Sequence, residues 1–167
     1  FSSQYKNFDG LLTNDFLNKK VDFRKELTLR GQLKFNITPK FKASTTLQYI
    51  DSKGGATHYS ISPEDAASGT GFTTYLDPNP TKGNNVISQD VFGESDMTNL
   101  YTNLNLEYTL ENVKLQAITS YSKVDRSTIG DLDFTNVDIF NGGLDQGEYN
   151  NTKSFNQELR LTNRKTD

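Results

Sequence analysis

Two runs of alternating apolar and polar residues, joined by a short break, constrain the fold of this chain more than any other feature. The first run covers residues 27–35, the second covers residues 41–49, and the break contains Thr38 and Pro39. Alternation with a period of two puts one kind of side chain on each face of a strand. The pattern therefore predicts an antiparallel hairpin with one apolar face and one polar face. Its apolar face takes Leu27, Leu29, Gly31, Leu33, Phe35, Phe41, Ala43, Thr45, Leu47 and Tyr49.

The apolar face of such a hairpin can meet one of two environments, a protein core or lipid. In a soluble protein the apolar face packs on a core and the polar face meets water. In a transmembrane β-barrel the apolar face meets lipid and the polar face lines a water-filled lumen. The hairpin alone favours the soluble interpretation, because sheets with one wet face are common.

Composition limits the alternatives. Hydrophobic residues make up 33% of the 167 residues and the mean hydropathy is -0.70, a lean supply for a soluble core. No apolar run approaches the about 18 residues of a transmembrane helix. Barrel strands need no such run, because their apolar residues stand at alternate positions. The absence of cysteine removes disulfides and thiolate chemistry.

Charge and chain ends give two further expectations. The net charge of -3 and the lack of a basic run among aromatics predict no nucleic-acid partner. The sequence starts with Phe1, without a leader, and already looks like a strand there. We therefore expect it to be a piece of a longer polypeptide.

Strand-like and loop-like segments follow one another unevenly. The pattern predicts an antiparallel segment of about five strands, the first stretch being irregular. The strand-like ranges are 2–12, 23–36, 41–50, 99–110, 113–124 and 153–163. Long loops are expected near 51–98 and 125–150, where glycine, proline, asparagine and aspartate cluster.

The lengths of the connections alternate. Tight turns at 37–40 and at Glu111-Asn112 fall on one side of the expected sheet and the long loops fall on the other. Outer-membrane barrels have this layout, with short periplasmic turns and long extracellular loops. Phe35 and Phe41 flank one tight turn, whereas Tyr49 and Tyr121 stand toward the long loops, as in interfacial girdles. These features together reverse the initial preference for the soluble interpretation.

Charged and amide side chains share the face opposite the apolar one. Under the barrel interpretation they face the lumen or a plug domain, where charge is tolerated. The residues expected there are Arg30, Lys34, Lys42, Gln48, Asn103, Glu107, Lys114 and Arg160.

Aromatic residues of the long loops are the candidates for binding an external ligand. They are Tyr59, Phe72, Tyr75, Phe134 and Phe140. The alternative for each is packing of the loops against one another.

No enzyme or metal site is predicted. His58, the single histidine, stands in a glycine-rich loop and is interpreted as solvated rather than catalytic. Asp131, Asp133 and Asp138 are possible oxygen ligands for Ca²⁺, but the twelve-residue calcium-loop pattern is missing. A solvated acidic loop is therefore the preferred interpretation. The sequence points to no catalytic residue and no cofactor.

Several segments resemble the barrel of TonB-dependent outer-membrane receptors. The most specific are FNQELRL at 155–161 and QAITSYS at 116–122. LRGQL at 29–33, LQY at 47–49, DLDF at 131–134 and Asp9-Gly10 also fit. The resemblance covers nearly the whole chain except the interiors of the two long loops.

The resemblance implies a slice of a 22-stranded transmembrane barrel in the outer membrane of a Gram-negative bacterium. It implies a receptor that imports a scarce nutrient, most often a ferric siderophore, with energy passed through TonB. Outer-membrane lipid, the receptor's own plug, its remaining strands and the TonB complex would be the partners. The sequence lacks the energy-coupling box, the plug and the closing strand, so the slice is not expected to transport alone. The alternative is a soluble or surface-anchored β-domain that binds polysaccharide or protein through its long loops.

Overall fold

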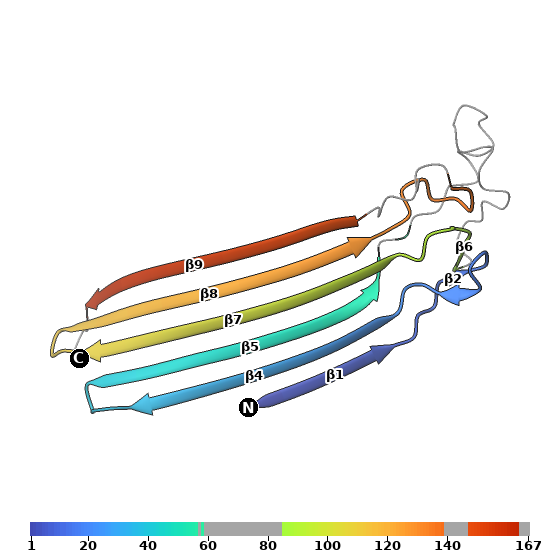
Figure 1. Ribbon diagram of the computed structural model, residues 1–167. Helices are drawn as coiled ribbons and strands as arrows, with labels where there is room; N and C mark the ends of the chain where they lie inside the picture. Colours follow the sequence, from blue (N-terminus) through green and yellow to red (C-terminus); the bar gives the residue numbers. More distant parts are fainter. Residues whose placement is uncertain (57, 59–84, 139–146, 164–167) are drawn as a thin grey trace.

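The computed structural model describes residues 1–56, 58, 85–138 and 147–163, and within these ranges the protein is all-β (Figure 1). Six long strands form one antiparallel sheet in the order β1-β4-β5-β7-β8-β9, each paired with the next long strand along the chain. The bounds are Ser2–Phe8 for β1, Arg24–Asn36 for β4, Phe41–Gly55 for β5, Glu94–Thr109 for β7, Val113–Ile129 for β8 and Gly147–Asn163 for β9. The expected all-β antiparallel class is thus confirmed.

Within the described residues this sheet does not close into a barrel. β1 pairs only with β4, and β9 pairs only with β8. The two outermost strands each leave one backbone edge without a partner strand, as the open sheet of Figure 1 shows. Unpaired edges of this kind are templates for further strands.

The tight turns lie at one end of the sheet and the long connections lie at the other (Figure 1). In the first turn the Thr38 hydroxyl oxygen accepts a hydrogen bond from the Phe41 backbone N–H at 2.9 Å. In the second, the Leu110 N–H donates to the Val113 carbonyl at 2.8 Å across Glu111 and Asn112. Both expected tight turns are therefore present.

The strands differ from the expected ranges mainly toward the long loops. β5 continues to 55, β7 begins at 94, β8 continues to 129 and β9 begins at 147, all inside segments expected to be loops. Alternation stops there because both faces carry polar side chains, but the backbone pairing continues, with Lys53 opposite Asp96. β1 ends early, at Phe8, yet is regular enough to be a sixth strand.

A second, small sheet stands among the long connections. It has the order β3-β2-β6 and consists of β2 (Thr13–Asn14), β3 (Lys19–Lys20) and β6 (Val86–Ile87). We call the described residues 10–23, 56, 58, 85–93 and 130–138 the cap. Here the chain closes tightly on itself: a Cβ added to Gly55, at the end of β5, would lie 1.7 Å from the Val21 carbonyl oxygen.

The described part of the protein has almost no hydrophobic core. Its buried apolar side chains are Val21 and Ile87, both in the cap. Along the long strands, large apolar side chains remain exposed, among them Leu33, Leu47 and Leu104. No helix in the described residues is long and apolar enough to cross a membrane.

Candidate functional site

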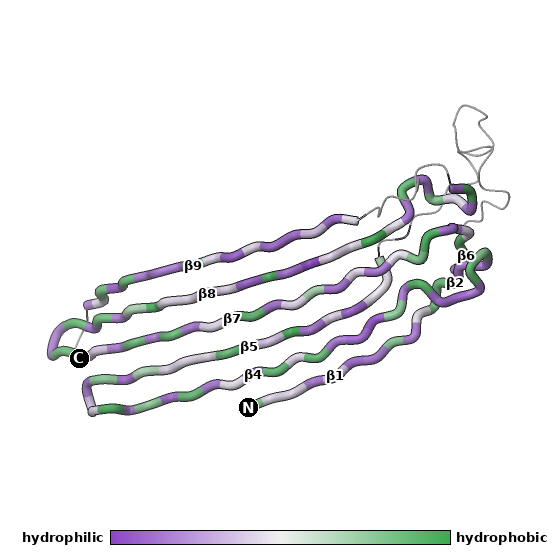
Figure 2. Tube along the Cα trace, viewed as in Figure 1, coloured by the Kyte–Doolittle hydropathy of each residue, from purple (hydrophilic) through white to green (hydrophobic). Residues whose placement is uncertain are grey.

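The register of the sheet separates its two faces cleanly. Residues opposite each other in antiparallel strands share a face, so the rows can be followed from strand to strand. One row joins Lys42, Glu107, Gln116 and Arg160. The next row along joins Ala43, Leu106, Ala117 and Leu159 on the opposite face. Figure 2 shows the resulting alternation of hydropathy along the strands.

The polar face carries all eight residues that the sequence assigned to a lumen. Arg30 stands opposite Gln48, and Lys34 stands two rows further toward the tight turns. Lys42 stands opposite Glu107. Asn103 follows on β7, Lys114 on β8 and Arg160 on β9, each at a position of the same face. The structure thus brings these side chains together on one surface.

The acids of this face near the tight turns are already paired. The Glu107 carboxylate lies 2.6 Å from the Lys114 ammonium, across the β7–β8 ladder. The Glu158 carboxylate receives two hydrogen bonds from Arg160, the one from Nη2 at 2.9 Å. The Gln116 side-chain amide donates to the Asn105 side-chain oxygen at 2.9 Å.

Three cations of the same face do not take part in these ion pairs. Arg30, Lys34 and Lys42 form no ion pair with any residue in the described ranges. Between Lys34 and Lys42 the face is hollowed, with a volume of about 150 Å³. This hollow is a polar, positively charged feature, because its one acid, Glu107, is turned to Lys114.

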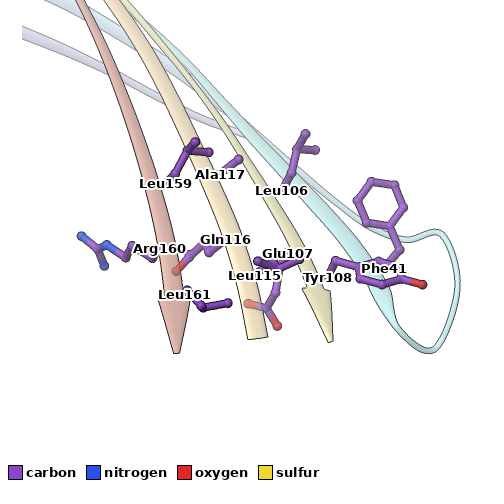
Figure 3. Close-up of a pocket in the computed structure, with 10 residues that line it drawn as sticks. All are labelled: Phe41, Leu106, Glu107, Tyr108, Leu115, Gln116, Ala117, Leu159, Arg160 and Leu161. Carbon is purple, nitrogen blue, oxygen red and sulfur yellow. The ribbon is translucent and has the colours of Figure 1, made fainter. Parts of the chain in front are cut away.

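The apolar face is free of charge on β5 and β7 over five successive rows, which start on β5 at Phe41, Ala43, Thr45, Leu47 and Tyr49, and on β8 and β9 over the first four of these, because Lys123 and Lys153 stand in the Tyr49 row. Toward the tight turns it holds a groove of about 360 Å³ between β7, β8 and β9. Its side chains are drawn in Figure 3. The small side chain of Ala117 leaves this space among larger neighbours, and the rings of Phe41 and Tyr108 meet beside it with centroids 6.2 Å apart.

Toward the long loops the apolar face gives way to ion pairs. Lys53 lies 3.2 Å from Glu94, and Lys123 lies 2.6 Å from Asp125. These residues stand at the long-loop end of the strands. The charge-free band therefore ends on that side, one row earlier on β8 and β9 than on β5 and β7.

The cap is held by buried polar side chains rather than by apolar ones. The fully buried Asn14 donates to the Gln89 carbonyl at 2.8 Å and accepts from the Leu17 N–H at 3.2 Å. His58 is half-buried, with Nε2 3.0 Å from the Val21 carbonyl and Nδ1 3.3 Å from the Gln89 side-chain oxygen. The interpretation of His58 as a solvated histidine was therefore wrong, because its ring is half-buried and contacts two other residues of the cap.

One carboxylate of the cap, that of Asp22, binds the backbone just before β2. Asp22 accepts hydrogen bonds from the Leu11 N–H at 3.0 Å and the Leu12 N–H at 2.7 Å. Partial burial raises its pKa, but these two hydrogen bonds and the nearby Lys20 outweigh burial and bring the pKa below its ordinary value. Asp22 is thus a charged side chain that holds the backbone of Leu11 and Leu12 in place.

Of the three acids in the loop after β8, Asp138 is exposed, as expected of a solvated loop, whereas the other two are buried, contrary to that expectation. Asp131 is 5% exposed and Asp133 is 8% exposed. One oxygen of Asp131 accepts from the backbone N–H groups of Asp133 and Phe134, and its other oxygen is buried without a hydrogen-bond partner. Burial, with the charges of Asp133 and Asp90, raises the pKa of Asp131 to about 6. No group of three or more acids or histidines in the described residues could hold a metal ion.

The predicted ligand-binding aromatics are only partly placed. Phe134 is half-buried in the turn capped by Asp131, at a backbone φ of 61°. Tyr59, Phe72, Tyr75 and Phe140 lie outside the described residues. Of these five residues the structure therefore places Phe134 alone.

Sequence reasoning missed the residues that organise the cap. Asn14 and Gln89 are 75 positions apart in the chain yet hydrogen-bonded, and neither belongs to an alternating pattern. A stacked ring pair, Phe23 and Phe92 with centroids 5.9 Å apart, was missed for the same reason, and the Lys19 ammonium lies 5.3 Å from the Phe92 ring centroid.

Comparison of the chain with protein-family models, with curated proteins and with solved structures gave no match. The geometry of the two faces and of the cap is therefore the basis for any statement about function.

Proposed function

We propose that this chain is part of the transmembrane barrel of an outer-membrane receptor that imports a scarce nutrient. The observation that carries the proposal is the apolar face of the long sheet, charge-free over five rows on β5 and β7 and over four on β8 and β9, and covered by nothing in the described residues. Leu104, in the middle row, is 43% exposed, and Leu159 is 78% exposed. A soluble domain of this size would bury such a face against a second layer.

The height of the charge-free band fits a bilayer. On β5 its rows run from Phe41 to Tyr49, a rise of about 27 Å along the strand, and on β8 it ends one row earlier, before Lys123. Strands of membrane barrels are tilted by about 35–45°, so the band is about 20 Å tall, close to the about 25 Å typical of such barrels.

Aromatic residues stand at both borders of the charge-free band, as expected for a membrane barrel. Phe41 and Tyr108 stand together at the tight-turn border, and Tyr49 stands at the other. Amphipathic rings are enriched where hydrocarbon meets water. Lys123 stands in the Tyr49 row and Lys53 stands beyond it, so headgroups and water would solvate the ion pairs of both. The tight turns would then be periplasmic and the cap extracellular.

The open edges of β1 and β9 suit continuation of the sheet by further strands of the same polypeptide. A closed barrel removes such edges, and the resemblance to TonB-dependent receptors suggests 22 strands in the whole. The polar face would line the lumen and contact a plug or the passing solute. A ferric siderophore is the solute class that the resemblance favours, with energy supplied through TonB.

Uptake of iron tests the transport part of the proposal. Cells that produce the full-length polypeptide, and cells that lack it, are given radioactive iron complexed with a catecholate or with a hydroxamate siderophore. We expect uptake of one complex that requires both the polypeptide and an energised inner membrane. Equal uptake by both cell types with both complexes would refute iron import, and membrane insertion would be judged separately.

A further inference from the structure

The hollow on the polar face near the tight turns has the composition of an anion receptor. Its polar lining consists of Lys34, Asn36, Lys42, Ser44, Asn105 and Glu107. Two ammonium groups, one hydroxyl and two amides can donate hydrogen bonds there, and ammonium groups are strong donors to oxyanions.

The neighbours of the hollow leave these donors available. Glu107 stands directly opposite Lys42, yet its carboxylate is 2.6 Å from Lys114 instead. The Asn105 side-chain oxygen accepts a hydrogen bond from the Gln116 amide, so the side-chain NH₂ group of Asn105 is the part left to bind a ligand. Lys34 and Lys42 have no carboxylate partner among the described residues.

From this arrangement we propose that Lys34, Lys42 and the Asn105 amide bind one oxyanion group, a phosphate or carboxylate, of a solute that enters the water-filled side of the sheet. The volume of about 150 Å³ suits a single such group. Arg30, also without an ion-pair partner and on the same face of β4, would guide the solute along the strand toward the hollow. The site does not depend on which solvent the opposite, apolar face meets.

Inorganic phosphate is the first probe and acetate is the second. The full-length polypeptide is purified in detergent, and phosphate is titrated at low salt with phosphorus NMR as the readout. We expect saturable binding that acetate displaces, because the site recognises the oxyanion rather than phosphorus. Lys34→Gln and Lys42→Gln should each weaken phosphate binding by about tenfold.

Two further variants make the test specific. Lys25→Gln removes the same charge from the opposite face, where Lys25 stands opposite Lys53, and should leave phosphate binding unchanged. Glu107→Gln should strengthen binding, since it removes the carboxylate of the hollow and releases Lys114. A circular dichroism spectrum like that of the parent protein shows that each variant is folded.

The proposal is overturned if phosphate fails to bind saturably, or if Lys25→Gln weakens binding as much as Lys34→Gln does. Phosphate that binds but is not displaced by acetate also contradicts it. A polypeptide that inserts into membranes but binds no phosphate refutes this site and leaves the proposed function standing. A polypeptide that binds phosphate but never enters a membrane supports this site and refutes the proposed function.

Discussion

Leu104→Lys places a charge at the middle of the charge-free band. Leu104 lies in the row of Thr45 and Thr119, two rows from either border, and is 43% exposed. Lysine at the midplane of a membrane barrel costs about 2 to 4 kcal/mol, and the cost falls to about 0 to 1 kcal/mol near the interfaces. We therefore expect the free energy of unfolding in lipid vesicles to fall by about 2 to 4 kcal/mol.

Two variants serve as matched controls. Asn103→Lys adds the same side chain one position away on the polar face, and we expect a change within about 0.5 kcal/mol. Leu29→Lys adds it at the border row, opposite Tyr49, where the cost should be about 0 to 1 kcal/mol.

The assay is reversible denaturant unfolding of the full-length polypeptide in phospholipid vesicles, followed by circular dichroism. The membrane assignment predicts the order Leu104→Lys, then Leu29→Lys, then Asn103→Lys, from largest to smallest loss. Equal losses for Leu104→Lys and Asn103→Lys would refute the assignment of faces. Equal losses at Leu104 and Leu29 would refute the placement of the bilayer.

Three further predictions concern the cap. Raising the pKa of Asp131 from 3.8 to about 6 corresponds to roughly 3 kcal/mol. This stability is fully present below pH 3.8 and is lost as the pH rises through about 6. Asp131→Asn should remove this dependence, so above pH 6 the amides of residues 130–137 should exchange more slowly in the variant than in the parent protein. Asn14→Ala removes the hydrogen bonds that the Asn14 side chain donates to the Gln89 carbonyl and accepts from the Gln89 N–H and should destabilise the cap by about 1 to 3 kcal/mol, measured by faster amide exchange at residue 89 with exchange in β8 unchanged. Gly55→Ala puts a Cβ against the Val21 carbonyl oxygen, so it should open the cap to limited proteolysis, and unchanged cleavage would contradict the close approach.

The alternation of residues predicted the faces of the long sheet because a period of two is a local property. Leu104 and Asn103 were assigned to opposite faces, and the register places them so. The tight turns were predictable for the same reason, since Thr38 and Asn112 belong to short connections. Strand ends were not, because pairing continues past the apolar band, where Lys53 and Asp96 still face each other.

The cap could not be predicted from the same signals. Asn14 meets Gln89 only because the folded sheet brings its loops to one end, and no local pattern encodes that contact. Asp131 was expected to be solvated because an acidic loop usually is, whereas it is buried in a turn that it caps itself and that is hydrogen-bonded to the residues after β6, the Thr135 carbonyl accepting from the Asp90 N–H at 3.0 Å. The charge of the hollow between Lys34 and Lys42 likewise depends on the side chain of Glu107, which pairs with Lys114 rather than with Lys42.

The measurement that tests the central claim most directly is the fractionation of the native polypeptide that carries these residues. Under the membrane assignment it stays with the outer membrane until detergent is added, is several times heavier than the 18.8 kDa of this chain, and migrates differently on a gel when it is not boiled. A stable monomer of about that mass in detergent-free buffer would contradict the assignment. The apolar face would then have to be covered by a soluble layer of the same protein.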